Sequence, residues 1–248
     1  MSRPSADLGR QMQELAKSDL KLQETLVALL DNMNRYRYAY NWTWFGRPII
    51  QIPQDTMLFQ EMIWELKPDL IVETGVAHGG SVIFSASILA LLETFGMVRT
   101  PLVIGIDIDI REENYIEIES HPARKWVSRI EASSTDPETV ATVREIAKDK
   151  KCVMVFLDSN HEHNHVLREL RAYAEMVTVG SLLVVLDTGI DTIDSSVIAA
   201  GRPWGRGNSP LSALRDFLTE NSDFVSDDSY HNKAWITSFP SGVIRRIS

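Results

Sequence analysis

The run 70–81, which reads LIVETGVAHGGS, constrains the fold more than any other part of the chain. Apolar residues lead up to Glu73, and a short apolar run bounded by turn residues is typical of a buried strand in a parallel sheet. The glycines that follow predict a tight turn whose backbone comes close to a ligand. Ser81 is expected to cap the apolar helix 82–92. The run therefore predicts a strand, a binding turn and a helix in succession.

The spacing of the glycines and the position of Glu73 narrow the kind of ligand. The pattern G-x-x-x-G-G is not the dinucleotide fingerprint G-x-G-x-x-G, and no lysine follows the glycines as in a P-loop. Glu73 stands where it would repel a phosphate, whereas it suits a ligand with an ammonium or sulfonium group. An ordinary strand-to-helix turn is the alternative. The pattern favours S-adenosylmethionine over a nucleoside triphosphate.

A second apolar run, residues 102–109, also ends in carboxylates. A carboxylate at the tip of the second strand of a βαβ unit accepts hydrogen bonds from ribose hydroxyls. Asp107 is the better placed of the two acids, and Asp109 is the second choice. A solvated strand end is the alternative, but the two runs together are more specific than either alone.

Charge and cysteine content exclude several classes of protein. A net charge of −9 over 248 residues makes the chain a poor candidate for binding nucleic acid through phosphates. Cys152 is the only cysteine, so no disulfide framework is expected and a reducing compartment is the natural setting. We expect no signal peptide, and the longest apolar run is too short to span a bilayer. These observations predict a cytoplasmic protein that binds neither nucleic acid nor membrane.

Periodicity and composition divide the chain into an N-terminal extension, residues 1–55, and a larger domain, residues 56–248. Apolar residues at helical spacing over 7–33 predict one helix or two. The aromatic segment 36–45 is expected to be irregular. It is interpreted as a substrate lid, a subunit contact or a strap packed on the core.

Several local features of the larger domain carry expectations of their own. Asp55 or Thr56 is expected to cap a helix that ends before Pro68. Residues 111–120 are expected to be irregular. The last strands, 234–239 and 243–247, are expected to form an antiparallel hairpin through a two-residue turn.

Strands that alternate with helices predict an α/β fold, with a Rossmann-like, doubly wound and mostly parallel sheet. Ligands of such sheets bind beyond the carboxyl ends of the strands, near the switch in strand order. Four predicted strands carry a carboxylate at or near that end, namely Glu73, Asp107, Asp158 and Asp187. Their mutual repulsion is costly without a cation. The pattern therefore predicts a positively charged cofactor, a metal ion, or both.

These motifs resemble the cephalosporin hydroxylase and rhamnosyl O-methyltransferase family over residues 40–248. The resemblance is carried by Trp44, Gly46, Arg47, Pro48, Ile49, Gln51, Pro53, Asp55, Lys67, Pro68, Asp69, Glu73, Thr74, Gly75, Gly79, Gly80, Ser81, Gly105, Ile106, Asp107, Leu157, Asp158, Ser159, Asn160 and His161. It implies an S-adenosylmethionine-dependent O-methyltransferase of Rossmann type that acts on a small natural product or sugar. It also implies Mg²⁺ as a frequent metal and assembly as a homo-oligomer.

The resemblance implies a set of site residues. Those expected at the cofactor are Glu73, Gly75, Gly79, Gly80, Ser81 and Asp107, with Ser133 and Ser134 at the adenine. Asp158 and Asp187 are expected to share one Mg²⁺, which prefers oxygen ligands and would lower the pKa of the acceptor hydroxyl. His161 is expected to act as the general base.

One position departs from the family pattern. An acid is expected before the aspartate of the fifth strand, whereas this chain has Leu186. Thr188, Asp191 and Asp194 are candidates to compensate. The metal is therefore less firmly expected than the cofactor.

Two other functions stay open from the sequence. The run 161–165 reads HEHNH, and two histidines with a carboxylate hold Fe(II) in oxygenases, which would make the chain a hydroxylase. Because Leu186 replaces the expected acid, the chain could also be a non-catalytic member of the family that binds the cofactor or a partner without turnover. The methyl acceptor is expected between the segment 36–45 and the loop 189–208, with Trp204 and Arg206 as contacts. Its identity, and transfer to oxygen rather than nitrogen, are left open.

Overall fold

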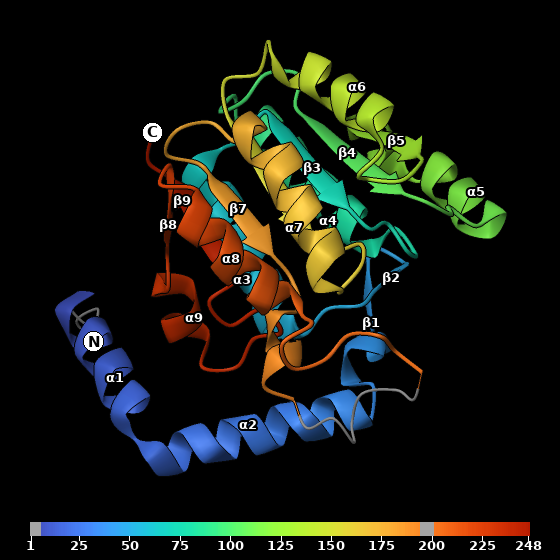
Figure 1. Cartoon of the computed structure of the whole chain (residues 1–248). Helices are drawn as coiled ribbons and strands as arrows, with labels where there is room; N and C mark the ends of the chain where they lie inside the picture. Colours follow the sequence, from blue (N-terminus) through green and yellow to red (C-terminus); the bar gives the residue numbers. More distant parts are fainter. Residues whose placement is uncertain (1–5, 194–200) are drawn as a thin grey trace.

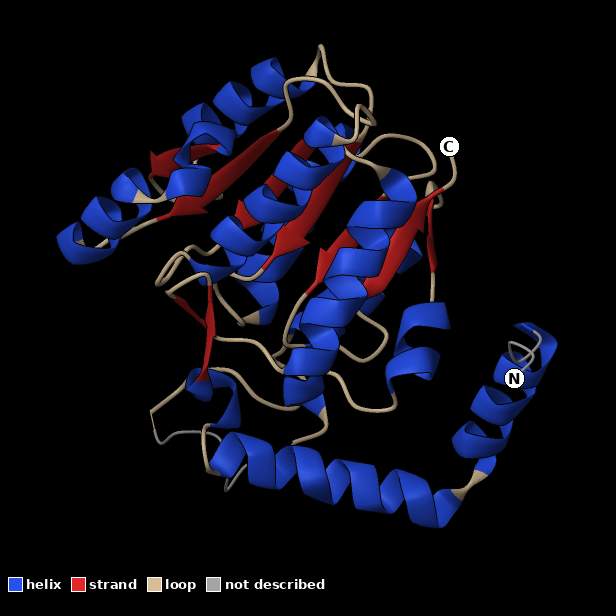
Figure 2. Ribbon diagram, turned by 180° about the vertical axis from the view of Figure 1, so that it is seen from behind, coloured by secondary structure: helices blue, strands red, loops and turns tan. Residues whose placement is uncertain are grey.

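A seven-stranded sheet forms the centre of the computed structural model, which describes residues 6–193 and 201–248 (Figure 1, Figure 2). The strand order is β5-β4-β3-β6-β7-β9-β8. The strands span Leu70–Thr74 (β3), Leu102–Asp107 (β4), Val127–Glu131 (β5), Val153–Leu157 (β6), Leu182–Val185 (β7), Phe224–Ser226 (β8) and Val243–Arg246 (β9). The strands β3 to β7 pair in parallel, whereas β9 runs antiparallel to both β7 and β8. The predicted α/β, mostly parallel sheet is confirmed.

Helices cover both faces of this sheet (Figure 1). The main helices are α3 (Pro53–Leu66) and α4 (Gly80–Thr94) on one face, and α6 (Pro137–Ala147), α7 (His163–Tyr173) and α8 (Pro210–Glu220) on the other. The shorter elements are α5 (Glu112–Ser120), α9 (Ser229–Ala234) and the 3₁₀ turns η2 (Pro122–Trp126), η3 (Ala174–Met176) and η4 (Thr188–Asp191). The sheet is thus enclosed between two helical layers, which explains why its central strands are largely apolar.

Strand β6 illustrates how the sequence builds two cores. Met154 and Phe156 belong to the core beneath α3 and α4. Val153, Val155 and Leu157 belong to the core beneath α7 and α8. All five side chains are buried, because side chains alternate between the faces of a strand and both faces are covered.

The strand order reverses between β3 and β6. Strands β4 and β5 follow β3 toward one edge, while β7 follows β6 toward the other. The two central strands pair from Leu70 with Val153 to Thr74 with Leu157. A crevice at the carboxyl ends of such a pair is the usual ligand position in doubly wound sheets. The turn after β3 and Asp158 after β6 meet at this point.

The N-terminal region lies across the same edge of the sheet (Figure 2). It consists of α1 (Ala6–Ser18), α2 (Leu20–Arg35), η1 (Tyr38–Asn41) and a short antiparallel hairpin of β1 (Trp42–Trp44) and β2 (Arg47–Ile49). The hairpin is anchored on α4, where Trp44 Nε1 donates to Ser87 Oγ at 3.0 Å. In contrast, α2 has no buried residue. The helical stretch predicted as one helix or two forms two helices, and part of the expected irregular segment is this hairpin.

Three local expectations are wrong. Residues 112–120 form helix α5 rather than an irregular segment. Helix α3 begins at Pro53 with Ile52 as its N-cap, so neither Asp55 nor Thr56 caps it. Residues 234–239 form no strand, because α9 ends at Ala234 and Trp235 adopts a left-handed backbone, φ 62°. Strand β9 therefore pairs antiparallel with β7 and β8 instead of with residues 234–239.

Residues 6–193 and 201–248 contain no helix with both the length and the apolar character of a membrane span.

Candidate functional site

The turn between β3 and α4 packs closely against two other segments of the chain. Gly75 has φ 90°, and a Cβ there would overlap the backbone carbonyl of Asp158. A Cβ on Gly80 would overlap the carbonyl of Pro48 in β2. These glycines therefore allow close contact between chain segments, in addition to their expected role at a ligand.

Ser81 and Glu73 form a pair beneath the turn. Gly79 is the N-cap of α4, so the expectation that Ser81 caps this helix is wrong. Ser81 lies in the first turn and its hydroxyl donates to Glu73 Oε1. Burial raises the pKa of Glu73 to about 7, and the bond from Ser81 opposes this rise. Glu73 is thus a buried support of the turn.

Asp107 holds the same turn from the neighbouring strand. Its Oδ2 accepts hydrogen bonds from the backbone N–H groups of Val76 at 2.8 Å and Ala77 at 3.0 Å. Its Oδ1 accepts from the N–H of Asp109 at 3.2 Å. Each of these bonds to a charged acceptor is stronger than a neutral one. Asp107 therefore fixes the glycine turn in addition to standing at the predicted ribose position.

Three potential metal ligands meet at the ends of β6 and β7. Asp158, His161 and Asp187 each offer a ligand atom, and these atoms lie within 4.8 Å of one another. His161 Nε2 is 3.3 Å from Asp187 Oδ2, and Gln51 Nε2 donates to Asp158 Oδ2 at 3.3 Å. Two carboxylates and an imidazole form a donor set suited to a divalent cation.

Charge repulsion at this group is not relieved by a lysine or arginine. Burial, and then the charge of Asp187, raise the pKa of Asp158 well above its usual range. Three further carboxylates add to that rise, namely Glu73, Glu169 and Asp55. Among the described residues, Asp158 forms no ion pair and Asp187 pairs only with His161. The arrangement is therefore stabilised by any cation that binds there.

Asp55 lies buried next to this group. Its Oδ2 accepts from the backbone N–H of Ser238 at 2.9 Å and from the Ser238 hydroxyl at 2.7 Å. Its Oδ1 has no hydrogen-bond partner among the described residues. Burial raises the pKa of Asp55 to about 6, and the charge of Asp187 contributes to the rise.

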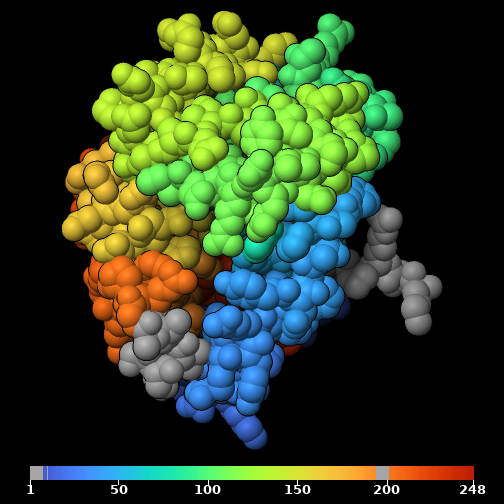
Figure 3. Space-filling view, turned by 90° about the vertical axis from the view of Figure 1, so that its right-hand side faces the viewer, coloured from blue at the N-terminus to red at the C-terminus, as the bar shows by residue number. Residues whose placement is uncertain are grey.

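A cavity of about 240 Å³ lies above these groups, where the surface is hollowed between the blue N-terminal residues and the orange segment (Figure 3). It is lined by Tyr40, Pro48, Ile50, Gln51, Gly75, Val76, Ala77, His78, Gly80, Ser81, Asp158, Ser159, His161 and Asp187. Six expected site residues therefore share one wall. Glu73, Gly79, Asp107, Ser133, Ser134, Trp204 and Arg206 do not line it.

Ser134 belongs to a polar cluster on α7. His165 Nε2 lies 3.2 Å from Ser134 Oγ and 3.1 Å from Ser159 Oγ. Ser159 in turn donates to the fully buried Glu169 at 2.6 Å. The loop after β5 is thereby tied to the loop after β6.

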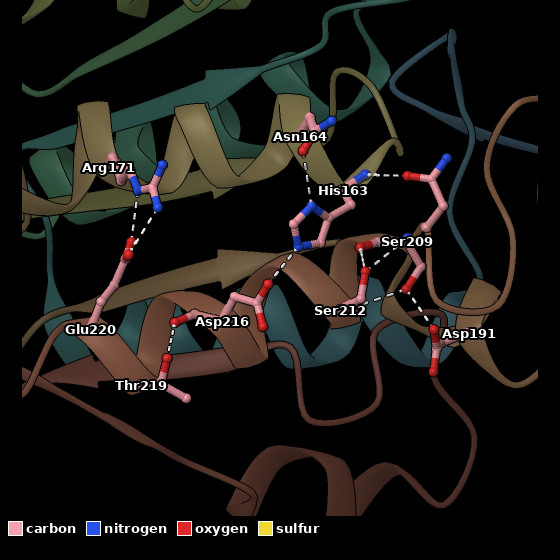
Figure 4. Close-up of polar contacts among 10 residues, drawn as sticks. His163, Asn164, Arg171, Asp191, Ser209, Ser212, Asp216, Thr219 and Glu220 are labelled. Carbon is pink, nitrogen blue, oxygen red and sulfur yellow. Dashed lines mark hydrogen bonds and ion pairs between the residues drawn. The ribbon is translucent and has the colours of Figure 1, made fainter.

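The three histidines of 161–165 point in different directions. His163 Nε2 lies 2.9 Å from Asp216 Oδ2 on α8 (Figure 4). His165 joins the serine cluster instead, and only His161 belongs to the candidate metal group. The described residues therefore offer no pair of these histidines to a single iron, and the oxygenase interpretation is wrong.

The candidates to compensate for Leu186 are engaged elsewhere. Leu186 itself is buried in the core. Thr188 Oγ1 donates to the carbonyl of Pro240, and Asp191 accepts from Ser209 (Figure 4). Asp194 lies outside the described residues. The third potential ligand is His161.

Trp204 and Arg206, the expected acceptor contacts, lie outside the cavity wall, and Trp204 packs against His161. The Trp204 ring meets the His161 ring edge-on, with centroids 5.0 Å apart. Arg206 is exposed, and its charge helps to lower the pKa of Asp191 below its ordinary value. Trp204 thus borders the site, whereas Arg206 is close to Asp191.

Gln51 and Tyr40 are wall residues that the sequence did not single out individually. Gln51 stands in the run that carries the family resemblance, which was the only signal for it. Tyr40 belongs to the aromatic segment, and its place at the cavity depends on the path of η1.

Comparison with known proteins is consistent with this geometry. The rhamnosyl O-methyltransferase/CmcI family model matches residues 36–247. A rhamnosyl O-methyltransferase of Mycobacterium tuberculosis is 28% identical over 210 residues, 82% of this chain and 78% of that protein. The one of Mycobacterium leprae is 27% identical over 151 residues, 60% of this chain and 61% of that protein.

Solved structures share the fold. The apo structure of CmcI has a TM-score of 0.57 at 19% identity and covers 84% of this chain and 77% of its own. The methyltransferase MycE, in complex with Mg and SAH, has a TM-score of 0.50 at 15% identity and covers 88% of this chain and 54% of its own. On the strength of the family match, the chain belongs to the rhamnosyl O-methyltransferase/CmcI family of S-adenosylmethionine-dependent O-methyltransferases.

Proposed function

We propose that the protein transfers the methyl group of S-adenosylmethionine to a hydroxyl of a small sugar or natural product, assisted by a divalent cation. The observation that carries the proposal is the convergence of Asp158, His161 and Asp187 within 4.8 Å at the switch point of the sheet. The relatives named rhamnosyl O-methyltransferase support a sugar hydroxyl as the acceptor.

The cofactor fits the cavity wall formed by the turn after β3. When bound, S-adenosylmethionine supplies an electrophilic methyl group on a sulfonium that an acidic site favours. Gly75 and Ser81 line the cavity directly, while Glu73, Gly79 and Asp107 shape the turn beneath it. We assign Ser133 and Ser134 to the adenine end, where the loop after β5 begins.

A divalent cation fits the donor set of Asp158 and Asp187. The buried carboxylate of Asp158, with neighbouring acids and no paired lysine or arginine, is the observation that supports it. Mg²⁺ prefers such oxygen ligands and would lower the pKa of an acceptor hydroxyl.

His161 is proposed to accept the proton of the acceptor hydroxyl. His161 Nε2 lies 3.3 Å from Asp187 Oδ2 and the ring meets Trp204 edge-on, so Nδ1 is the nitrogen left to accept the proton. The oxygen forms the new bond to carbon, the carbon–sulfur bond breaks, and the proton goes to His161.

The extension 1–55 is proposed to form the acceptor side of the site. Tyr40 and Gln51 reach the cavity from this part of the chain, opposite the segment that carries Trp204. Arg206 is retained as an outer contact of the acceptor.

A His161→Gln variant tests the proposal, with methyl-labelled S-adenosylmethionine and methyl α-L-rhamnoside as the probe acceptor. We expect kcat to fall roughly 10²–10⁴-fold, as for loss of a general base, with SAH binding intact. His163→Gln, two residues further along the chain at the start of α7 and paired with Asp216, is the matched control and should retain full activity. Unchanged turnover in His161→Gln would remove His161 from the mechanism. Failure of the wild type to methylate the rhamnoside would reject that acceptor.

A further inference from the structure

A second cavity adjoins the first and opens toward the N-terminal helices. It has a volume of about 170 Å³ and shares Tyr40, Ile50, Gln51 and Asp187 with the cofactor cavity. Its other walls come mainly from α2 and η1. Because Asp187 belongs to both walls, a molecule in the second cavity can present a group to the site of transfer. Its volume lies below the roughly 300–1,000 Å³ of drug-sized pockets, so it suits a single substituted ring.

The wall of the second cavity includes a positively charged residue, Arg37. Arg37 is the only lysine or arginine that lines either cavity in the described part of the chain. Its guanidinium forms no hydrogen bond or ion pair within that part. Asp187 lines the same cavity, but its ionic partner is His161 rather than Arg37. The cavity therefore has a carboxylate at the reacting side and a separate guanidinium.

Other arginines near the site are already engaged. Arg47 is buried and donates to the carbonyl of His78 at 2.6 Å and to Asn114 at 2.9 Å. Arg202 lies over the Trp204 ring, 4.7 Å from its centroid. Arg37 differs from both because its guanidinium has no hydrogen-bond or ion-pair partner among residues 6–193 and 201–248.

The backbone conformation at position 37 does not itself favour an arginine. Arg37 has φ 51° and ψ 43°, a left-handed conformation that is unfavourable for a residue with a Cβ. Its N–H donates to the carbonyl of Asn34, and its carbonyl accepts from the N–H of Tyr40, both at 3.0 Å. Glycine or asparagine would serve these backbone bonds at lower conformational cost. The turn thus places Arg37, an exposed residue, in the wall of the second cavity.

We propose that the methyl acceptor is a small hydroxylated ring compound that carries a carboxylate, and that Arg37 binds this carboxylate. The inference rests on the proposed function, which puts the reacting hydroxyl at His161 and Asp187. A guanidinium binds a carboxylate through two parallel hydrogen bonds, and one arginine balances one negative charge. Tyr38 and Tyr40, in the same wall, offer aromatic surface to the ring. Arg37 is thereby a specificity-determining residue.

Two matched pairs of probes test this inference. The first pair is the methyl glycosides of glucuronic acid and of glucose, and the second is 3-hydroxybenzoate and 3-hydroxybenzamide. Binding of each to the full-length protein, saturated with SAH and Mg²⁺, is measured by ligand-observed NMR titration. In at least one pair, we expect the acid to bind about tenfold more tightly, the size expected for a hydrogen bond to a charged group.

Three variants show whether the charge at position 37, rather than a change in the stability of the fold, causes the preference for the acid. Arg37→Asn should abolish the preference for the acid while leaving the thermal midpoint unchanged or higher, because asparagine tolerates the left-handed region. Arg37→Lys should retain part of the preference. Arg35→Asn, two residues away on α2 and outside both walls, should retain all of it.

Equal binding of acid and neutral probe by the wild type would overturn the inference. So would a preference that survives in Arg37→Asn. Because SAH binding is measured on the same sample, a protein that binds SAH and does not discriminate rejects only the carboxylate. A protein that binds no SAH rejects the proposed function itself.

Discussion

At the ends of β3 and β4 the acidic side chains are held by donors of the chain itself, whereas at the ends of β6 and β7 they face one another. Asp107 accepts from two backbone N–H groups, and Glu73 accepts from Ser81. Asp158 accepts from Gln51 Nε2 at 3.3 Å and Asp187 lies 3.3 Å from His161 Nε2, while the pKa of Asp158 is raised by burial and by its acidic neighbours. The first pair holds the turn, whereas the second leaves a negative charge that a cation would offset. Carboxylates at equivalent strand ends therefore differ in their surroundings.

The largest effect is expected from removing a carboxylate at the ends of β6 and β7. Asp187→Asn should weaken Mn²⁺ binding, followed by electron paramagnetic resonance, by more than the roughly 10–100-fold that loss of an outer-shell partner costs. Without metal the same variant should be at least as stable as the wild type, because the repulsion with Asp158 is reduced. Asp109→Asn, an exposed carboxylate beyond β4, is the control and should bind Mn²⁺ normally. Full Mn²⁺ affinity in Asp187→Asn would show that the metal lies elsewhere.

The same substitution at Asp107 should have the opposite effect on stability. Asp107→Asn weakens the charged acceptor of the Val76 and Ala77 N–H groups, and bonds of this kind contribute about 1.5–3 kcal/mol each. We expect the free energy of unfolding, from urea titration without metal, to fall by about 2 kcal/mol. Hydrogen exchange at Val76 and Ala77 should become faster. An unchanged free energy together with unchanged exchange would mean that Asp107 does not hold the turn.

A smaller effect is expected from Glu73 and depends on pH. Burial raises its pKa from 4.5 to about 7, so the unfolded chain releases this proton at lower pH than the native protein. Its contribution to stability is therefore complete below about pH 4 and is lost as the pH rises through 7. Glu73→Gln should match the wild type at pH 4.5 and exceed it at pH 8, by on the order of 2 kcal/mol. A stability difference that is the same at both pH values would contradict this account.

Much of the sheet could be predicted because its strands are covered on both faces. β3, β4, β6 and β7 are apolar runs that end near an acid, so their type and their shared edge follow from the residues alone. The same reasoning brought Asp158, His161 and Asp187 to one end of the sheet. Local periodicity suffices where burial is complete.

The errors occur where tertiary contacts decide the local structure. Helix α5 buries only Asn114 and Ile118, so its periodicity is weak and its acidic residues resemble those of a loop. The expected strand at 234–239 fails because Trp235 turns the chain with a positive φ. The close packing of Gly75 on Asp158 and of Gly80 on Pro48 was not anticipated, because both partners are distant in sequence.

The acceptor wall could be predicted as a segment but not residue by residue. The aromatic segment 36–45 was expected beside the acceptor, and Arg37 and Tyr40 from this segment line the two cavities. Nothing in the sequence singled out these two residues, because their position depends on how α2, which lies across the ends of the strands, packs against the sheet (Figure 1).

Calorimetric titration of the purified protein with S-adenosylhomocysteine tests the central claim most directly. The account predicts binding at one site in the micromolar range, weakened at least tenfold in Asp107→Ala because the glycine turn loses its anchor and the ribose its acceptor. Circular dichroism on the same samples verifies that both proteins are folded. Absence of binding to the folded wild type, or equal affinity in Asp107→Ala, would contradict the cofactor site at the carboxyl ends of β3 and β4.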